Sequence, residues 1–502
     1  MNLFRLALLL VPLLVCFPAT TSAAAKPNVL LLCVDDLKPA LGCYGDALAK
    51  SPNIDRLAAR GARFDLAFCN QSVCAPSRNN LLLGSRSTSI GIYGLDRNFR
   101  TAVPDAVTMT QHFMQHGYRA EAVGKILHTG HGNRDDDASW SVPSVKEKVV
   151  EYLDPKNSAG GQLTREEAFF TNQKLGEIGK LPRGAATEIS DVPDRAYADG
   201  RIADEGIQRL RAAKERGRPF FLALGFVKPH LPLTAPKKYF DLHDPAKFAL
   251  ALDQHDPVGA PKYARKVGGE IVNYDPLTVE NLKQADTQRR LLHAYYACVS
   301  YMDAQLGRVL DELDRLGLAQ STLIVLWGDH GWHLGDHGYW TKHTNYEQAN
   351  RIPLLVVAPG VTQPGSATRQ PAETVDLFPT LAELAGLPAP AGPQPRDGLS
   401  LVPVLCDPAR RLRDHAYHAY PRGERIGRAI RTERYRLVEW KKPGAPTDTA
   451  EFELYDYQTD AGECRNLAAE QPQILAQLRA VLARHPEARL PFANQPKKNA
   501  NP

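Results

Sequence analysis

The sequence has few cysteines, eight among 502 residues, and no CxxC pair of the kind that holds structural zinc. It also lacks an HExxH motif, although four histidines lie close together in DHGWHLGDHGYWTKH, residues 329–343. The cysteines are widely spaced, which is not typical of a small disulfide framework. Without these common uses of cysteine, a reason is needed for Cys74 in NQSVCAPSRNNLLLG, residues 70–84, beside a proline and an arginine.

A strong charge of one sign is also absent. The formal net charge is +5 and no basic run is present, so the sequence does not indicate nucleic-acid binding. A basic cleft that faces an anionic substrate is compatible with this charge. No stretch after residue 25 is apolar enough to cross a membrane, so we expect no membrane span.

Residues 1–25 predict a secretory signal peptide, because Arg5 precedes a short apolar run that is followed by small residues. A lipoprotein anchor at Cys16 is the alternative, disfavoured by Val15, where a small residue is wanted. We therefore expect a periplasmic or secreted mature protein. Its seven remaining cysteines are an odd number, so at least one is unpaired or chemically special.

Apolar runs that end in polar residues alternate with helical patterns along the chain. PNVLLLCVDDL (27–37), RPFFLALGFVKPH (218–230) and STLIVLWGDHG (321–331) are typical of buried strands. This alternation predicts an α/β fold with a large, mainly parallel or mixed central sheet and helices on both faces. Residues 141–200, with more charge and weak periodicity, predict a long surface excursion.

A Pro/Gly-rich stretch, residues 385–398, is followed by two strand-like runs, RAIRTERYRLVEW and FELYDYQTD, and by a final helical pattern. We expect a small C-terminal α+β subdomain with a short antiparallel sheet. The predicted division is a signal peptide (1–25), a large N-terminal domain (26–405), the C-terminal subdomain (406–490) and a flexible tail (491–502).

Two pairs of polar residues follow predicted strands and are candidate metal ligands. Asp35 and Asp36 follow one strand, and Asp329 and His330 follow another. Adjacent buried carboxylates repel each other unless a cation neutralises them, and oxygen-rich ligands favour calcium or magnesium. The alternative is that these acids are ordinary loop residues. Two such pairs at one sheet edge favour a metal site.

Basic residues also lie at predicted strand ends and turns. Lys125 and His128 lie three residues apart, Lys228 and His230 follow a second strand, and Lys342 lies in the histidine-rich loop. A lone lysine is usually solvated on the surface. Together, these side chains around a metal predict a pocket for a polyanionic group such as sulfate or phosphate.

Cys74 stands in C-A-P-S-R, which matches C-x-P-x-R, the recognition core for oxidation of cysteine to formylglycine. A thiol nucleophile, a buried filler and a disulfide with Cys69 are the alternatives that the residues alone leave open. NNLLLG, which follows, predicts a helix whose positive N-terminus faces the same anionic site.

Longer stretches resemble one family in order along the chain. They are VDDLKPALGCYGD, SPNIDRLAARGARFDLAFCNQSVCAPSRNNLLLGSR, GYRAEAVGKILH, FLALGFVKPHLP, GDHGWHLGDHGYWTKHTNYEQANRIPLLVVAPG and ELYDYQTDAGECRNLA. On these motifs the chain resembles a type I sulfatase of the alkaline phosphatase superfamily from about residue 27 to 490. KPHLP and the His330 that follows Asp329 are most similar to the iduronate-2-sulfatase branch.

The resemblance implies one Ca²⁺ ion, a formylglycine made from Cys74 by a formylglycine-generating enzyme, and a sulfated saccharide substrate. The implied metal ligands are Asp35, Asp36, Cys74 in its oxidised form, Asp329 and His330. The implied catalytic side chains are Cys74, Arg78, Lys125, His128, His230 and Lys342. Among them, Arg78 would bind the hydroxyls of the aldehyde hydrate, His128 would be the base, and His230 or Lys342 the acid.

The resemblance also implies a class of substrate. A 2-O-sulfated uronic acid is the first expectation, with other sulfated polysaccharides close behind. Lys228, Trp332 and His343 are further substrate-binding candidates, although aromatic residues in this loop are as readily explained by core packing. The alternatives are a phosphonate or phosphate ester hydrolase of the same superfamily, or a non-catalytic glycan-binding protein if Cys74 stays unmodified.

Overall fold

The computed structural model describes residues 26–128, 135–144, 152–158, 160 and 183–492. The predicted signal peptide, the alternative anchor at Cys16 and most of the predicted tail lie outside these ranges, as does much of the predicted surface excursion. In the part of the chain that is described, no helix is long and apolar enough to cross a membrane.

The core of the molecule is a sheet of seven strands. In spatial order they are β10 (Ser366–Thr368), β2 (Ala62–Phe64), β9 (Leu354–Val357), β8 (Thr322–Gly328), β1 (Asn28–Val34), β6 (Phe220–Phe226) and β4 (Arg119–Gly124). β9 pairs antiparallel with both of its neighbours, and every other pairing is parallel. The predicted mainly parallel, mixed sheet is therefore confirmed.

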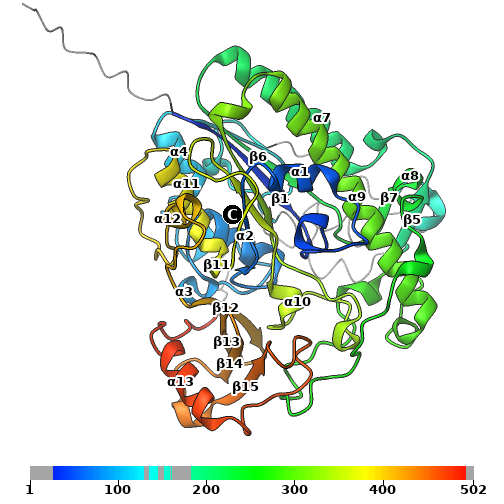
Figure 1. The fold of residues 1–502 in the computed structure, drawn as a ribbon, viewed down its shortest axis with the longest axis vertical. Helices are drawn as coiled ribbons and strands as arrows, with labels where there is room; N and C mark the ends of the chain where they lie inside the picture. Colours follow the sequence, from blue (N-terminus) through cyan, green and yellow to red (C-terminus); the bar gives the residue numbers. More distant parts are fainter. Residues whose placement is uncertain (1–25, 129–134, 145–151, 159, 161–182, 493–502) are drawn as a thin grey trace, which may run out of the picture.

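Helices cover both faces of this sheet (Figure 1). On β1, Leu30 and Leu32 belong to one apolar core while Leu31 and Cys33 belong to the other, because successive side chains of a strand point to opposite faces. The first core is closed by α1 (Pro52–Ala58), α7 (Ala198–Arg216) and α9 (Ala285–Arg315). The second is closed by α2 (Cys74–Leu83), α4 (Met109–Gln115), α11 (Leu377–Leu384) and α12 (Val402–Cys406).

Shorter elements complete the main domain. Two small parallel pairs are formed by β3 (Ala67–Phe68) with β11 (Ala372–Glu373) and by β5 (Thr187–Ser190) with β7 (Leu233–Pro236). The short helices are α3 (Ser87–Ile90), α8 (Lys237–Phe240) and α10 (Glu347–Asn350).

The C-terminal region is an antiparallel sheet of four strands with one long helix. The strands are β12 (His415–Arg422), β13 (Arg425–Thr432), β14 (Tyr435–Lys441) and β15 (Glu451–Asp456), and α13 (Pro472–Leu482) packs on them. The sequence predicted two strands here and missed two. One strand was missed because the run RAIRTERYRLVEW contains a turn at Glu433 and Arg434 and forms parts of both β13 and β14. The other, β12, was missed because it is rich in His and Tyr rather than in aliphatic residues.

Candidate active site

Most of the predicted site residues follow four neighbouring parallel strands, β8, β1, β6 and β4, whereas Cys74 and Arg78 lie on α2. In the register of these strands Val34 lies beside both Gly328 and Phe226. Asp35 and Asp329, the next residues of two strands, therefore emerge at the same level. The carboxyl ends of parallel strands are where ligands bind in sheets of this kind, so the topology itself brings the predicted side chains to one edge.

Two glycines let β4 and β6 meet closely where Lys125 leaves the sheet. A Cβ on Gly225 would lie 2.1 Å from the carbonyl oxygen of Lys125. Gly124 has φ +77°, a left-handed conformation, and a Cβ there would lie 2.2 Å from the Gly225 oxygen. Glycine at both positions therefore allows the turn that sends Lys125 into the site.

Cys74 is the first residue of α2, so the helix begins five residues earlier than the run Asn79–Gly84 suggests. Cys74 and Arg78 are four residues apart on this helix and share one face. The C-x-P-x-R spacing thus presents the sulfur and the guanidinium side by side. Both side chains are buried, with relative exposures of 2% and 0%.

Arg78 ties the strand ends together. Its Nε donates to Asp329 Oδ2 at 3.0 Å, and its Nη2 lies 3.3 Å from Asp35 Oδ1. Its Nη1 donates to the carbonyl oxygens of Lys125 and Ile126. Arg78 therefore links the residues that follow β1, β4 and β8.

Two lysines lie on the paired aspartates. Lys125 Nζ forms an ion pair with Asp35, and Lys342 Nζ lies 2.8 Å from Asp36 Oδ1. Asp36 has φ 57°, which is uncommon outside glycine, and its carbonyl accepts a hydrogen bond from the Tyr295 hydroxyl at 2.8 Å. This backbone turn directs two consecutive carboxylates to the site from one strand end.

The buried carboxylates affect one another strongly. Burial and the charge of Asp35 raise the pKa of Asp329 to about 7. Burial raises the pKa of Asp36 well above its usual range, although the Lys342 ammonium opposes this shift. Burial acts in the same direction on Asp35, but Lys125, His230 and Arg78 together outweigh it, and the pKa of Asp35 is well below its usual value. The cations in contact with Asp36 and Asp329 therefore do not fully offset the burial of these two carboxylates.

A metal ion would supply the remaining positive charge, and the donors are close enough to hold one. One ligand atom each from Asp35, Cys74, Asp329 and His330 lies within 4.8 Å of the others, and Asp36 and His230 form an overlapping group with Asp35 and Cys74. Asp35 Oδ1 is buried and accepts no hydrogen bond among the described residues. Carboxylate oxygens dominate this set, which fits a hard cation such as Ca²⁺.

Cys74 does not have the properties of a thiolate nucleophile. Burial raises the pKa of its thiol well above the usual value, an effect that Lys342 only partly opposes. His330 Nε2 lies 3.2 Å from the sulfur. Cys69 and Cys74 are both free, so the disulfide alternative is wrong. Thiol sulfur is also a poor ligand for a hard cation, whereas an oxygen at this position would fit the set.

Burial also lowers the pKa of His330 well below its usual value, with Lys342 acting in the same direction. The imidazole is therefore neutral, as a metal ligand must be. His128 is buried three residues after Lys125, at the end of the same turn.

Glu270 is a site residue that the sequence did not predict. Its Oε1 lies 3.7 Å from His230 Nε2 and its Oε2 lies 3.5 Å from Lys342 Nζ. His230 Nε2 is in turn 4.0 Å from Asp36. The only local signal for Glu270 is the preceding Gly268–Gly269 pair, because the surrounding segment has no periodic pattern.

The three further substrate-binding candidates lie in different surroundings. Lys228 Nζ donates to the carbonyl oxygens of His230 and Pro232, so it supports the His230 loop. Trp332 lies under Lys342, whose Nζ is 5.3 Å from the ring centroid. His343 lies beside Tyr420 of β12, with ring centroids 6.1 Å apart. Lys342 thus has Trp332 and His343 as its neighbours.

Comparison with known proteins gives two family matches. The profile described as Sulfatase matches residues 27–387, and the profile described as N-sulphoglucosamine sulphohydrolase, C-terminal, matches residues 335–487. The chain is 36% identical to the iduronate 2-sulfatase of Mus musculus over 430 residues, covering 78% of this chain and 74% of that one. It is 34% identical to the iduronate 2-sulfatase of Homo sapiens over 483 residues, covering 82% and 84%.

Solved structures share the fold at lower identity. A protein in complex with its substrate D-glucosamine-2-N,6-O-disulfate superposes with a TM-score of 0.70 at 21% identity, covering 91% of this chain and 97% of that one. A phosphonate monoester hydrolase from Silicibacter pomeroyi superposes with a TM-score of 0.69 at 22% identity, covering 92% and 95%.

Proposed function

Since the chain belongs to the sulfatase family, we propose that it hydrolyses a sulfate ester of a saccharide through a formylglycine made from Cys74, with one bound Ca²⁺. The observation that carries the proposal is the position of Cys74. It lies on the same helix face as Arg78 and reaches the cluster of Asp35, Asp329 and His330.

The side chains around Cys74 suit a reaction that concentrates negative charge. Asp35, Asp36, Asp329 and His330 would hold the cation, together with the oxidised residue 74. As an aldehyde hydrate, residue 74 would supply one hydroxyl that attacks sulfur and a second hydroxyl whose deprotonation releases sulfate. When bound, Ca²⁺ would neutralise charge on the transferring group.

The chain's own cations would orient the sulfate. Lys125, Lys342 and Arg78 bring three positive charges to a buried site, where electrostatic stabilisation is much stronger than in water. Arg78 is fixed by Asp329, so we assign it to residue 74. Lys125 and Lys342 have single flexible ammonium groups, and we assign them to the sulfate oxygens.

Proton transfers fall to the two histidines. His230 lies between Asp36 and Glu270, and we assign it, with Lys342, to the leaving oxygen of the sugar. Burial, Lys342 and Lys125 lower the pKa of His230 well below its usual value, and the Glu270 carboxylate near Nε2 acts against that shift. We assign His128, on the Lys125 turn, as the base that leads to sulfate release.

For the substrate we propose a 2-O-sulfated uronic acid, which the 36% identity to an iduronate 2-sulfatase supports. We also propose that residues 1–25 direct export and that a formylglycine-generating enzyme oxidises Cys74. Hydrolysis of a phosphonate or phosphate ester is the second candidate, because a phosphonate monoester hydrolase has the same fold.

The test is sulfate release from a panel of defined sulfated disaccharides, by protein produced together with a formylglycine-generating enzyme. We expect the highest kcat/KM on a disaccharide with a 2-O-sulfated uronic acid at its non-reducing end. Nitrophenyl sulfate and nitrophenyl phosphate are compared in parallel. Faster cleavage of the phosphate would support the second candidate, and no hydrolysis of any ester would support the binding protein.

A further inference from the structure

We propose that Lys266, His343 and Arg422, here called the basic rim, form a subsite for a second anionic group of the saccharide, beside the side chains assigned to the scissile sulfate. The group is a carboxylate or a second sulfate on the same or the adjoining sugar. The proposal rests on the proposed function and specifies the substrate class that the site accepts.

The basic rim is assembled from three distant parts of the chain. His343 directly follows Lys342. Arg422 is the last residue of β12, in the C-terminal sheet, and its Nη2 donates to the carbonyl oxygen of His343. The Arg422 guanidinium also lies 4.4 Å from the ring centroid of Tyr420, which packs near the His343 ring. The C-terminal sheet therefore reaches the lysine assigned to the sulfate.

Lys266 comes from the segment that also contributes Glu270. Both Lys266 and Thr341 lie next to Gly269. A Cβ placed on Gly269 would be 3.8 Å from Lys266 Cε and 2.9 Å from Thr341 Oγ1. The Lys266 side chain therefore lies against Gly269, which packs on Thr341, the residue before Lys342. Lys266, His343 and Arg422 interact electrostatically with one another, which places their charges close together.

No acid in the part of the chain that the structure describes pairs with the basic rim. Among the described residues, Lys266 and Arg422 form no salt bridge, and the ring nitrogens of His343 form no hydrogen bond. Arg422 donates instead to neutral carbonyl oxygens, including that of Tyr263 at 3.1 Å. Glu270 is engaged by His230 and Lys342.

The charges in the basic rim are also partly withdrawn from water. Burial and the Arg422 charge lower the pKa of Lys266, and burial together with Lys342, Lys266 and Arg422 lowers the pKa of His343 well below its usual value. Cations held together without a counter-charge repel each other, and an anionic ligand would relieve that repulsion.

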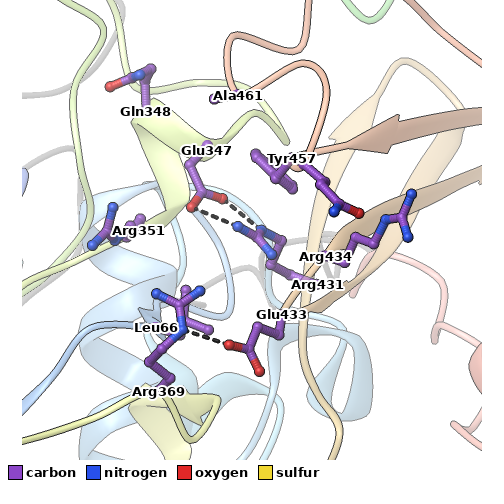
Figure 2. A pocket seen from close by; sticks show the side chains of 11 residues that line it. Leu66, Glu347, Gln348, Arg351, Arg369, Arg431, Glu433, Arg434, Tyr457 and Ala461 are labelled. Carbon is purple, nitrogen blue, oxygen red and sulfur yellow. Dashed lines mark hydrogen bonds and ion pairs between the residues drawn. The ribbon is translucent and has the colours of Figure 1, made fainter.

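A second basic region of the molecule does not share these properties. The cavity in Figure 2 is lined by Arg351, Arg369, Arg431 and Arg434. Glu347 and Glu433 reach into it, Arg431 pairs with Glu347 and Arg369 pairs with Glu433. Because carboxylates bind Arg369, Arg431 and, through Asp456, Arg434, the basic rim is the better site for an anion.

The test compares Lys266→Met with a matched control, Lys262→Met, which removes the same charge from an exposed position four residues earlier. The substrate is a disaccharide with a 2-O-sulfated uronic acid next to an N-sulfated glucosamine. We expect Lys266→Met to raise KM about tenfold, the effect of losing one charge-assisted contact, with kcat within about twofold. We expect Lys262→Met to leave both constants unchanged.

Two altered substrates identify the anionic group. If carboxyl reduction of the uronic acid removes the Lys266 effect, the subsite binds the carboxylate. If removal of the N-sulfate removes it, the subsite binds the second sulfate. An equal effect of Lys266→Met on all three substrates, or no effect on any, overturns the proposal.

A binding measurement separates this inference from the proposed function. Calorimetric titration of Cys74→Ala with the intact disaccharide needs no catalysis, and adding Lys266→Met should weaken binding about tenfold. Unchanged affinity would overturn the basic rim even if the enzyme is active. Absence of hydrolysis by the wild type, with Lys266-dependent binding retained, would reject only the proposed function.

Discussion

Two buried charge clusters in this molecule are built from the same kinds of side chain and differ in how completely they are neutralised. At the contact between α10 and the C-terminal sheet, Glu347 lies between Arg431 and Arg436, with its Oε2 3.0 Å from Arg431 Nε and 2.6 Å from Arg436 Nη2. These arginines outweigh the effect of burial and hold the pKa of Glu347 at about 2.

In the candidate active site, by contrast, carboxylates lie against one another. The pKa of Asp329 is about 7 and that of Asp36 is well above its usual range, although Arg78 and Lys342 are in direct contact with them. The contact between α10 and the C-terminal sheet, here called the seam, is therefore electrostatically satisfied without a ligand, and the active site is not. This difference distinguishes charges that stabilise the fold from charges arranged to bind an ion and an anion.

The largest expected effect is on catalysis, from Arg78→Lys. Lysine cannot contact Asp35, Asp329 and the Lys125 carbonyl at once, so residue 74 loses its fixed neighbour. We expect kcat on nitrophenyl sulfate to fall on the order of 10³-fold. Arg431→Lys, the same change in the seam, should keep kcat within about twofold. Equal losses in the two variants would show that the two clusters do not differ in function.

The next effect is on stability, from Glu347→Gln at the seam. The change leaves Arg431 and Arg436 buried without their counter-charge, and we expect a loss of about 3 kcal/mol in the free energy of unfolding near neutral pH. Because the pKa of Glu347 falls from 4.5 to about 2 on folding, its contribution is present above pH 4.5 and is lost as the pH falls toward 2.

Denaturant unfolding of the wild type and Glu347→Gln at several pH values checks this prediction. The difference between the two curves should shrink as the pH falls from 4.5 toward 2. A constant difference across that range would mean that the charge of Glu347 is not what stabilises the seam. Lys442→Met, at an exposed position of the C-terminal region, is the control and should change little.

The smallest of these effects is the stabilisation by calcium. A ligand that binds only the folded state at a concentration of 100 Kd stabilises it by about 2.7 kcal/mol. We expect added Ca²⁺ to raise the melting temperature of chelator-treated wild type and of Glu347→Gln, and to have no such effect on Asp36→Asn. A calcium shift that survives Asp36→Asn would contradict the assigned ligand set.

The structure brings predicted site residues together where a buried strand ends in polar residues. Asp35, His230 and Asp329 follow long apolar runs, so their positions at one sheet edge follow from the parallel topology. Arg78 was placed correctly beside Cys74 through its motif, but the start of α2 at Cys74 was not predicted. Its N-cap residue is Val73, which carries no capping side chain to signal the helix start.

Residues that reach the site from irregular segments were not predicted. Glu270 and Lys266 lie in a stretch without helical or strand periodicity, and Arg422 ends a strand whose His- and Tyr-rich sequence does not alternate clearly. Their proximity to Lys342 depends on how the C-terminal sheet packs on the main domain. Such contacts between distant segments leave no local pattern in the sequence.

The central claim is that Cys74 acts only after its oxidation. One experiment tests it directly: peptide mass analysis around residue 74 and sulfate release, measured side by side for the wild type and Cys74→Ala after production with a formylglycine-generating enzyme. We predict an aldehyde at residue 74 and sulfate release in the wild type, and no release by Cys74→Ala. Sulfate release that is unchanged in Cys74→Ala would contradict the account.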